Sequence, residues 1–91
     1  NQLDLGGGLD ISATPLKTLP KTLKIKGWFN LVGSSVVELP RGLSVGEWLD
    51  LRATHVRRLP RGLQVGGNLY LAGSLVTELP SDMRLGGTVD H

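Results

Sequence analysis

The sequence predicts a repeat solenoid built mostly of β-strands, with little or no α-helix. Three observations predict this fold class. Leu-Pro recurs every twenty residues without an insertion, and apolar residues alternate with other residues over two short stretches of each unit. Such alternation is the period of a strand with one buried face. Glycine and proline also interrupt every unit before ten residues of helical periodicity accumulate. The four Leu-Pro pairs are Leu19-Pro20, Leu39-Pro40, Leu59-Pro60 and Leu79-Pro80.

The repeat makes the 91 residues one domain of about 4.5 coils. A single unit cannot bury its own apolar side, whereas stacked coils share a continuous core. Strands of successive coils should therefore pair in parallel, about 4.8 Å apart. Neither end has the polar residues of a cap, so we expect a fragment of a longer array or self-association through the uncapped ends. The coils are 1–20, 21–40, 41–60, 61–80 and 81–91.

The first half of each coil should hold two extended stretches joined by a corner. In coil 61–80, Leu63 and Val65 form the first stretch, and Leu69 and Leu71 form the second. Gly66-Gly67 lies between them, and glycine permits the positive φ that we expect at such a corner. The result is a parallel sheet of one strand per coil, with a second short extended stretch beside it.

The second half of each coil begins with a column of small residues and a column of hydroxyl residues. A hydroxyl at a strand end can turn inward and bond backbone groups where the chain bends, and we expect this role here. An ice-binding array would need a second hydroxyl column on a flat face, and the twelfth position does not provide one. The hydroxyl column is Thr14, Ser34, Thr54 and Ser74, and the twelfth position is Ser12, Val32, Arg52 and Ala72.

The pattern L-x-L-x-x-[ST]-x-V-x-x-L-P, as in residues 69–80, resembles a leucine-rich repeat. Its length and Leu-Pro ending are similar to the short bacterial class found in type III secreted effectors. The resemblance implies a right-handed superhelix whose sheet lines a concave binding face, in a bacterial protein that is cytoplasmic or secreted. Thr or Ser replaces the asparagine of the family, and the glycine corner indicates a β-like convex side. No catalytic cysteine of an effector ligase domain can be carried over, because the chain has no cysteine.

Residues 8, 10 and 12 of each coil should point outward from the strand whose ninth and eleventh residues point inward. Trp28 and Trp48 then lie on neighbouring rungs, about 5 Å apart. Tryptophan, tyrosine and arginine are enriched at binding hot spots, so we expect a protein or peptide partner on this face. The candidate binding residues are Trp28, Trp48, Asn68, Asp10, Asn30, Asp50, Tyr70 and Arg52.

Other interpretations of the tryptophans stay open. They can form a stacking platform for carbohydrate, or they can stack on each other in a purely structural or self-assembling scaffold. They can also turn inward at a corner, although the polar Asn68 and Thr88 in the same column argue against that placement.

The acidic and histidine residues do not form a catalytic or metal site in this pattern. Asp10, Asp50 and Asp90 occupy alternate rungs of one column, about 10 Å apart, and an open sheet offers no pocket to raise the pKa of one of them. We therefore expect a solvated column and no enzyme. His55 and His91 have no acidic or thiol neighbours at metal-ligand spacing, so we expect no metal and no cofactor.

Composition narrows the remaining classes of partner. No apolar run approaches the roughly 18 residues that cross a bilayer, so no membrane partner is expected. The net charge of +2 is too small to indicate nucleic acid by itself. The basic residues flank the Leu-Pro columns with Glu38 and Glu78 among them, which favours a salt-bridged edge over a nucleic-acid track. These basic residues are Lys17, Lys21, Arg41, Arg57, Arg58 and Arg61.

Overall fold

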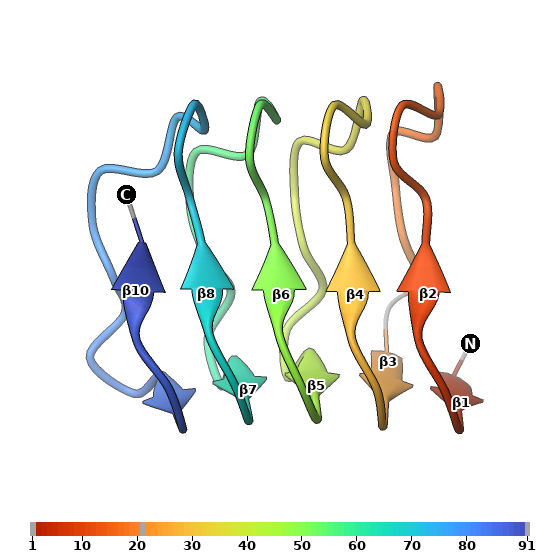
Figure 1. Cartoon of the computed structure of the whole chain (residues 1–91), viewed down its shortest axis with the longest axis vertical. Coiled ribbons are helices and arrows are strands. Elements are labelled where there is room, and N and C mark those ends of the chain that lie inside the picture. The colour runs from red at the N-terminus through yellow and green to blue at the C-terminus, as the bar shows by residue number, and fades with distance from the viewer. Residues whose placement is uncertain (1, 21, 91) are drawn as a thin grey trace.

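The computed structural model describes residues 2–20 and 22–90, without the side chains of residues 2–5 and 22. This part of the chain is a β-solenoid in which each coil contributes two short strands, and it contains no helix (Figure 1). The strands are β1 (Gln2–Leu5), β2 (Leu9–Asp10), β3 (Thr22–Ile25), β4 (Phe29–Asn30), β5 (Ser44–Val45), β6 (Leu49–Asp50), β7 (Gln64–Val65), β8 (Leu69–Tyr70), β9 (Arg84–Leu85) and β10 (Val89–Asp90).

The strands form two five-stranded sheets that run the length of the stack. Sheet A has the order β1-β3-β5-β7-β9, and sheet B has the order β2-β4-β6-β8-β10. Every pair is parallel, and each residue lies opposite the residue twenty positions later, as Phe29 lies opposite Leu49. The predicted coil length and parallel pairing are therefore confirmed. The second extended stretch also forms a complete sheet of its own.

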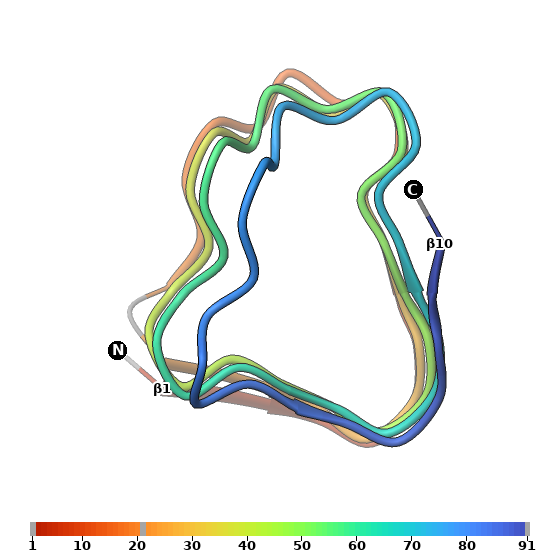
Figure 2. The same ribbon diagram turned by 90° about the vertical axis from the view of Figure 1, so that its left-hand side faces the viewer.

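Viewed along the stack, the coils superimpose as a closed outline in which the two sheets meet at a corner (Figure 2). The glycines at this corner do not have positive φ, so that expectation is wrong. Gly46, Gly66 and Gly86 are required because the coils approach closely there. A Cβ atom on Gly66 or Gly86 would collide with the carbonyl oxygen of the equivalent glycine in the preceding coil.

Positive φ occurs instead at Gly42 and Gly62 and at the thirteenth residue, directly after sheet B. The left-handed residue is glycine in two coils and alanine in the other two, although alanine adopts this conformation at a cost. The angles are 53° at Ala13, 70° at Gly33, 57° at Ala53 and 76° at Gly73.

The hydroxyl column follows this bend. The Thr14 hydroxyl donates to the Ile11 carbonyl oxygen at 2.7 Å, and the Thr54 hydroxyl donates to that of Leu51 at 2.8 Å. These bonds confirm the predicted inward role of the threonines. The Ser34 hydroxyl is buried without a hydrogen-bond partner, so the prediction is wrong at that coil.

The core lies inside the outline and consists of apolar columns. Phe29 is the largest fully buried side chain, with leucines above and below it in the same column. Burying one side chain of this size contributes about 1.5–3 kcal/mol, so a column of them stabilises the whole stack. The fully buried members of largest volume are Phe29, Leu23, Ile25, Leu31, Leu43, Leu49, Leu51, Leu63 and Leu69.

The third side of the outline is extended but unpaired. Residues 36–40, 57–60 and 76–80 make no backbone hydrogen bond to a neighbouring described coil. Proline explains this difference from the sheets, because Pro40, Pro60 and Pro80 lack the N–H that would continue a ladder. The residue before each proline is also restricted to extended conformations.

Candidate functional site

The eight predicted site residues gather on the outer face of sheet B. The residues that alternate with them in the central coils, such as Phe29 and Leu49, are fully buried in the core. The strands of this sheet lie side by side in a nearly straight row (Figure 1). In the view along the stack, successive coils of this sheet nearly superimpose, so the face is nearly flat over these coils (Figure 2).

Trp28 and Trp48 form a stack along this face. Their ring centroids are 5.1 Å apart and their planes differ by 6°. Both side chains are half-buried, so the inward placement is not observed. The other face of Trp28 covers Gly8, where a Cβ atom would overlap the indole ring. Both ring faces of Trp28 and one ring face of Trp48 are thus engaged within the column.

Asp10, Asn30 and Asp50 have a structural role that the sequence reasoning missed. Each side chain accepts a hydrogen bond from the backbone N–H two residues later, at 2.9, 3.0 and 3.1 Å, respectively. Such Asx turns bend the chain at the end of a strand. The recurrence of Asp or Asn at the tenth position, just before the small-residue column, was the available signal.

Asp50 is 3% exposed, so the prediction of a solvated acidic column is wrong at this coil. The reason is Arg52, whose Nη2 donates to Asp50 Oδ2 at 2.7 Å while its Nε lies 3.0 and 3.1 Å from the two carboxylate oxygens. These hydrogen bonds and the negative charge of Asp50 raise the pKa of Arg52 above its ordinary value. The two groups form a fixed bidentate pair.

The Arg52–Asp50 pair extends into a larger cluster. The Arg52 guanidinium lies over the Tyr70 ring, 5.4 Å from its centroid. Asn68 donates to the Tyr70 hydroxyl at 3.2 Å and accepts from the Thr88 N–H at 3.1 Å. The side chain of Arg52 is nevertheless 53% exposed. This face thus presents polar and aromatic groups that are held in place before any ligand arrives.

The outer face of sheet B carries no cluster of metal ligands among its described residues. No group of three or more His, Cys, Asp or Glu residues with metal-binding geometry occurs among the described residues. Four hollows of the described surface lie over the third side and over sheet A, away from this face. The arrangement can therefore make broad surface contacts, and it does not enclose a small molecule.

The described histidine and the described basic residues that flank the Leu-Pro columns do not belong to this face. His55, Arg57, Arg58 and Arg61 line the third side, and Lys21 and His91 lie outside the described residues. The predicted salt bridges of this edge are not observed, because the single ion pair of the described residues joins Arg52 and Asp50.

Comparisons of the chain with protein-family models, with curated proteins and with solved structures found no match. In the part of the chain that the structure describes, no helix has the length and apolar character needed to cross a membrane. The fold is thus a β-solenoid of 20-residue coils without an assigned family.

Proposed function

We propose that the chain is a non-enzymatic recognition module that binds a protein or peptide on the outer face of sheet B. The observation that carries the proposal is the cluster of Trp28, Trp48, Arg52 and Tyr70 on one face of the solenoid. Rigid aromatic and arginine side chains provide contact area at a low entropic cost.

The two sheets differ in a way that supports this assignment. The outward residues of sheet A are ordinary polar side chains, including Lys24, Gln64 and Arg84. Sheet B instead concentrates the two tryptophans and the single tyrosine of the chain. If stability alone selected these residues, the two outer faces would have similar compositions.

The resemblance of the coils to short bacterial leucine-rich repeats supports the same proposal, since such repeats use their sheet for recognition. On this view the protein is of bacterial type and acts in the cytoplasm or as a secreted effector. The 20-residue coil and the Leu-Pro ending are the features that support this assignment.

Carbohydrate binding is the second candidate, because two tryptophans lie together. Sugars stack on exposed ring faces, whereas both faces of Trp28 and one face of Trp48 pack within the column, which favours the protein partner. A purely structural role would require only the stack, which contributes about 0.5–1.5 kcal/mol beyond its buried area.

The test is a selection of peptides from a displayed random library on the immobilised chain, followed by affinity measurements on variants. Trp48→Ala and Arg52→Lys should weaken binding tenfold or more, since lysine cannot replace the bidentate guanidinium. Gln64→Ala, on sheet A, is the matched control and should leave affinity unchanged. Circular dichroism establishes that each variant is folded.

Peptides that bind Trp48→Ala and Arg52→Lys as tightly as the unmodified chain would overturn the proposal. The same four proteins are applied to a glycan array. Glycan binding that Trp48→Ala abolishes, without selected peptides that depend on this face, would replace the proposal with the carbohydrate candidate.

A further inference from the structure

The third side of the solenoid has a chain of open hollows between successive coils. One lies between coils 1–20 and 21–40, the next reaches coil 41–60, and the last lies between coils 41–60 and 61–80. The middle one has a volume of about 960 Å³ and shares Arg57, Arg58 and Leu75 with the last. The hollows therefore form one continuous groove along the stack, which we call the third-side groove.

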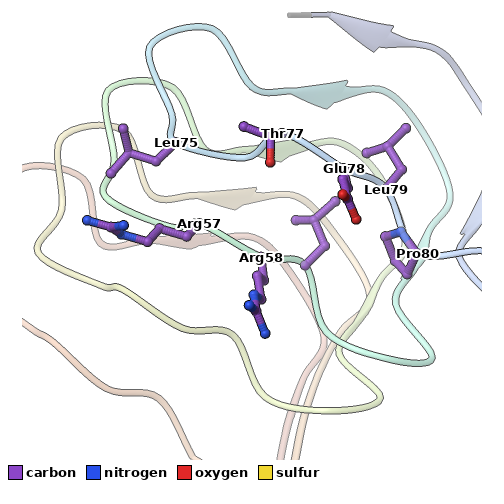
Figure 3. Close-up of a pocket in the computed structure, with 8 residues that line it drawn as sticks. Arg57, Arg58, Leu75, Thr77, Glu78, Leu79 and Pro80 are labelled. Atoms are coloured by element: carbon purple, nitrogen blue, oxygen red, sulfur yellow. The ribbon is translucent and has the colours of Figure 1, made fainter.

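Exposed aliphatic side chains lie along this groove. Val37 is 49% exposed, Leu75 is 43% exposed and Leu79 is 41% exposed. In Figure 3, Arg57 and Arg58 project from one coil, and Leu75, Glu78 and Leu79 belong to the next. Aliphatic groups with this much exposure in one groove are typical of an interaction surface.

The groove is also strongly basic. It holds five of the ten Lys and Arg side chains of the chain but only two of its eight carboxylates. Among the described residues, none of these seven groups makes a salt bridge. The cations are Lys17, Arg41, Arg57, Arg58 and Arg61, and the carboxylates are Glu38 and Glu78.

The backbone in the groove has free hydrogen-bonding capacity. Residues 57–60 and 76–80 make no backbone hydrogen bond to another described coil, in contrast to both sheets. A peptide that crosses these segments along the stack can form single hydrogen bonds with such groups, while the hollows between coils receive its side chains.

From these observations we infer that the third-side groove binds an extended acidic peptide whose carboxylates alternate with aliphatic side chains. The carboxylates pair with Arg57, Arg58 and Arg41, and the aliphatic side chains contact Val37 and Leu75. This surface is separate from the outer face of sheet B.

The same cations could attract nucleic acid, but the lining favours a peptide. Among the described residues, no Phe, Tyr or Trp side chain lines the groove, and single-stranded nucleic acid depends on aromatic stacking as well as on charge. Glu38 and Glu78 would repel a continuous row of phosphates, whereas a peptide can place an uncharged residue beside them.

The test uses a fluorescein-labelled eight-residue peptide in which Glu and Val alternate. About five extended residues span the roughly 14 Å between the first and fourth coils, so this length is sufficient. Fluorescence anisotropy measures its affinity for the chain and for variants. The peptide with Gln in place of Glu is the charge control, and a single-stranded oligonucleotide of equal charge is the nucleic-acid control.

Arg57→Glu combined with Arg58→Glu should weaken peptide binding at least tenfold, and Leu75→Asp should weaken it to a similar extent. Arg84→Glu, an exposed charge reversal on sheet A, should have an effect of less than threefold. All four substituted residues are exposed, so folding should be retained, and circular dichroism verifies it.

Equal affinity of the Glu and Gln peptides would overturn the proposal, as would equal losses in the groove variants and in Arg84→Glu. Binding of the oligonucleotide as tight as that of the Glu peptide would also overturn it, because the groove would then be a general polyanion surface. A failure here leaves the proposed function of sheet B untouched, because Trp48 and Arg52 lie on a different side.

Discussion

Replacing Ala53 with glycine should stabilise the solenoid. Ala53 has φ of 57°, in the left-handed region, where an L-residue other than glycine is disfavoured by about 1–2 kcal/mol. Glycine removes this strain but loses about 0.5–1 kcal/mol through the greater freedom of the unfolded chain. The free energy of unfolding should therefore rise by about 0.5–1 kcal/mol.

The reverse substitutions in the same column sharpen this prediction. A Cβ atom on Gly33 would lie 3.9 Å from the Ala13 Cα atom, so Gly33→Ala should lower stability by about 0.5–1 kcal/mol through strain alone. A Cβ atom on Gly73 would lie 3.2 Å from the Ala53 nitrogen, which adds a steric cost. Gly73→Ala should therefore be the less stable of the two.

Urea denaturation followed by tryptophan fluorescence measures these differences, and the slope with denaturant should not change. In a thermal melt, 1 kcal/mol corresponds to about 4–8 °C for a domain of this size. The control is Ala72→Gly, because Ala72 is not left-handed and should lose about 0.5–1 kcal/mol on becoming glycine. The reasoning fails if Ala53→Gly is no more stable than the unmodified chain, or if it behaves like Ala72→Gly.

Three other substitutions test separate features. Gly8→Ala should displace the Trp28 ring and change the near-ultraviolet circular dichroism of the stack, whereas an unchanged spectrum would contradict the packing of the indole on Gly8. Hydrogen bonds from Ser12, mainly from its hydroxyl and also from its backbone N–H, lower the pKa of Asp10 below 3.8. The stabilisation from these hydrogen bonds is therefore present above pH 3.8, and it is lost as the pH falls through the lower pKa that Asp10 has in the folded state. Between pH 5 and pH 2.5, urea denaturation should show a smaller decrease in the free energy of unfolding for Asp10→Asn than for the unmodified chain. An equal decrease would refute this linkage. Leu49→Ala should lower the free energy of unfolding by about 2–5 kcal/mol, and a loss below 1 kcal/mol would mean that the column is not close-packed.

The features that repeat every twenty residues were predictable from the sequence. The alternation in Leu69 and Leu71 predicted a buried strand face, and the constant spacing of Leu-Pro predicted parallel pairing without register shifts. The outward column of Trp28 and Trp48 followed from the same alternation. These predictions succeed because every coil contributes the same evidence to each column.

Features that depend on side-chain orientation or on contacts between coils were not predictable. The burial of Asp50 depends on Arg52, and no other coil has an arginine in that column. The glycines of the corner were expected for their φ angles but are required by a neighbouring carbonyl oxygen. The position of a residue in a column indicates which residues are its neighbours. Its rotamer and its distances from them decide whether it is buried, forms a hydrogen bond or makes a steric contact.

The unpaired third side determines how the stack can bend. Hydrogen bonds hold the coils about 4.8 Å apart along both sheets, but residues 36–40, 57–60 and 76–80 have no such bonds to adjacent described coils. Within these residues of the third side, contacts between side chains rather than backbone hydrogen bonds therefore set the spacing of the coils. The bulk of side chains such as Arg57 and Leu75 then sets the curvature. In an array of many such coils, substitutions on this one side would decide whether the array is straight or superhelical.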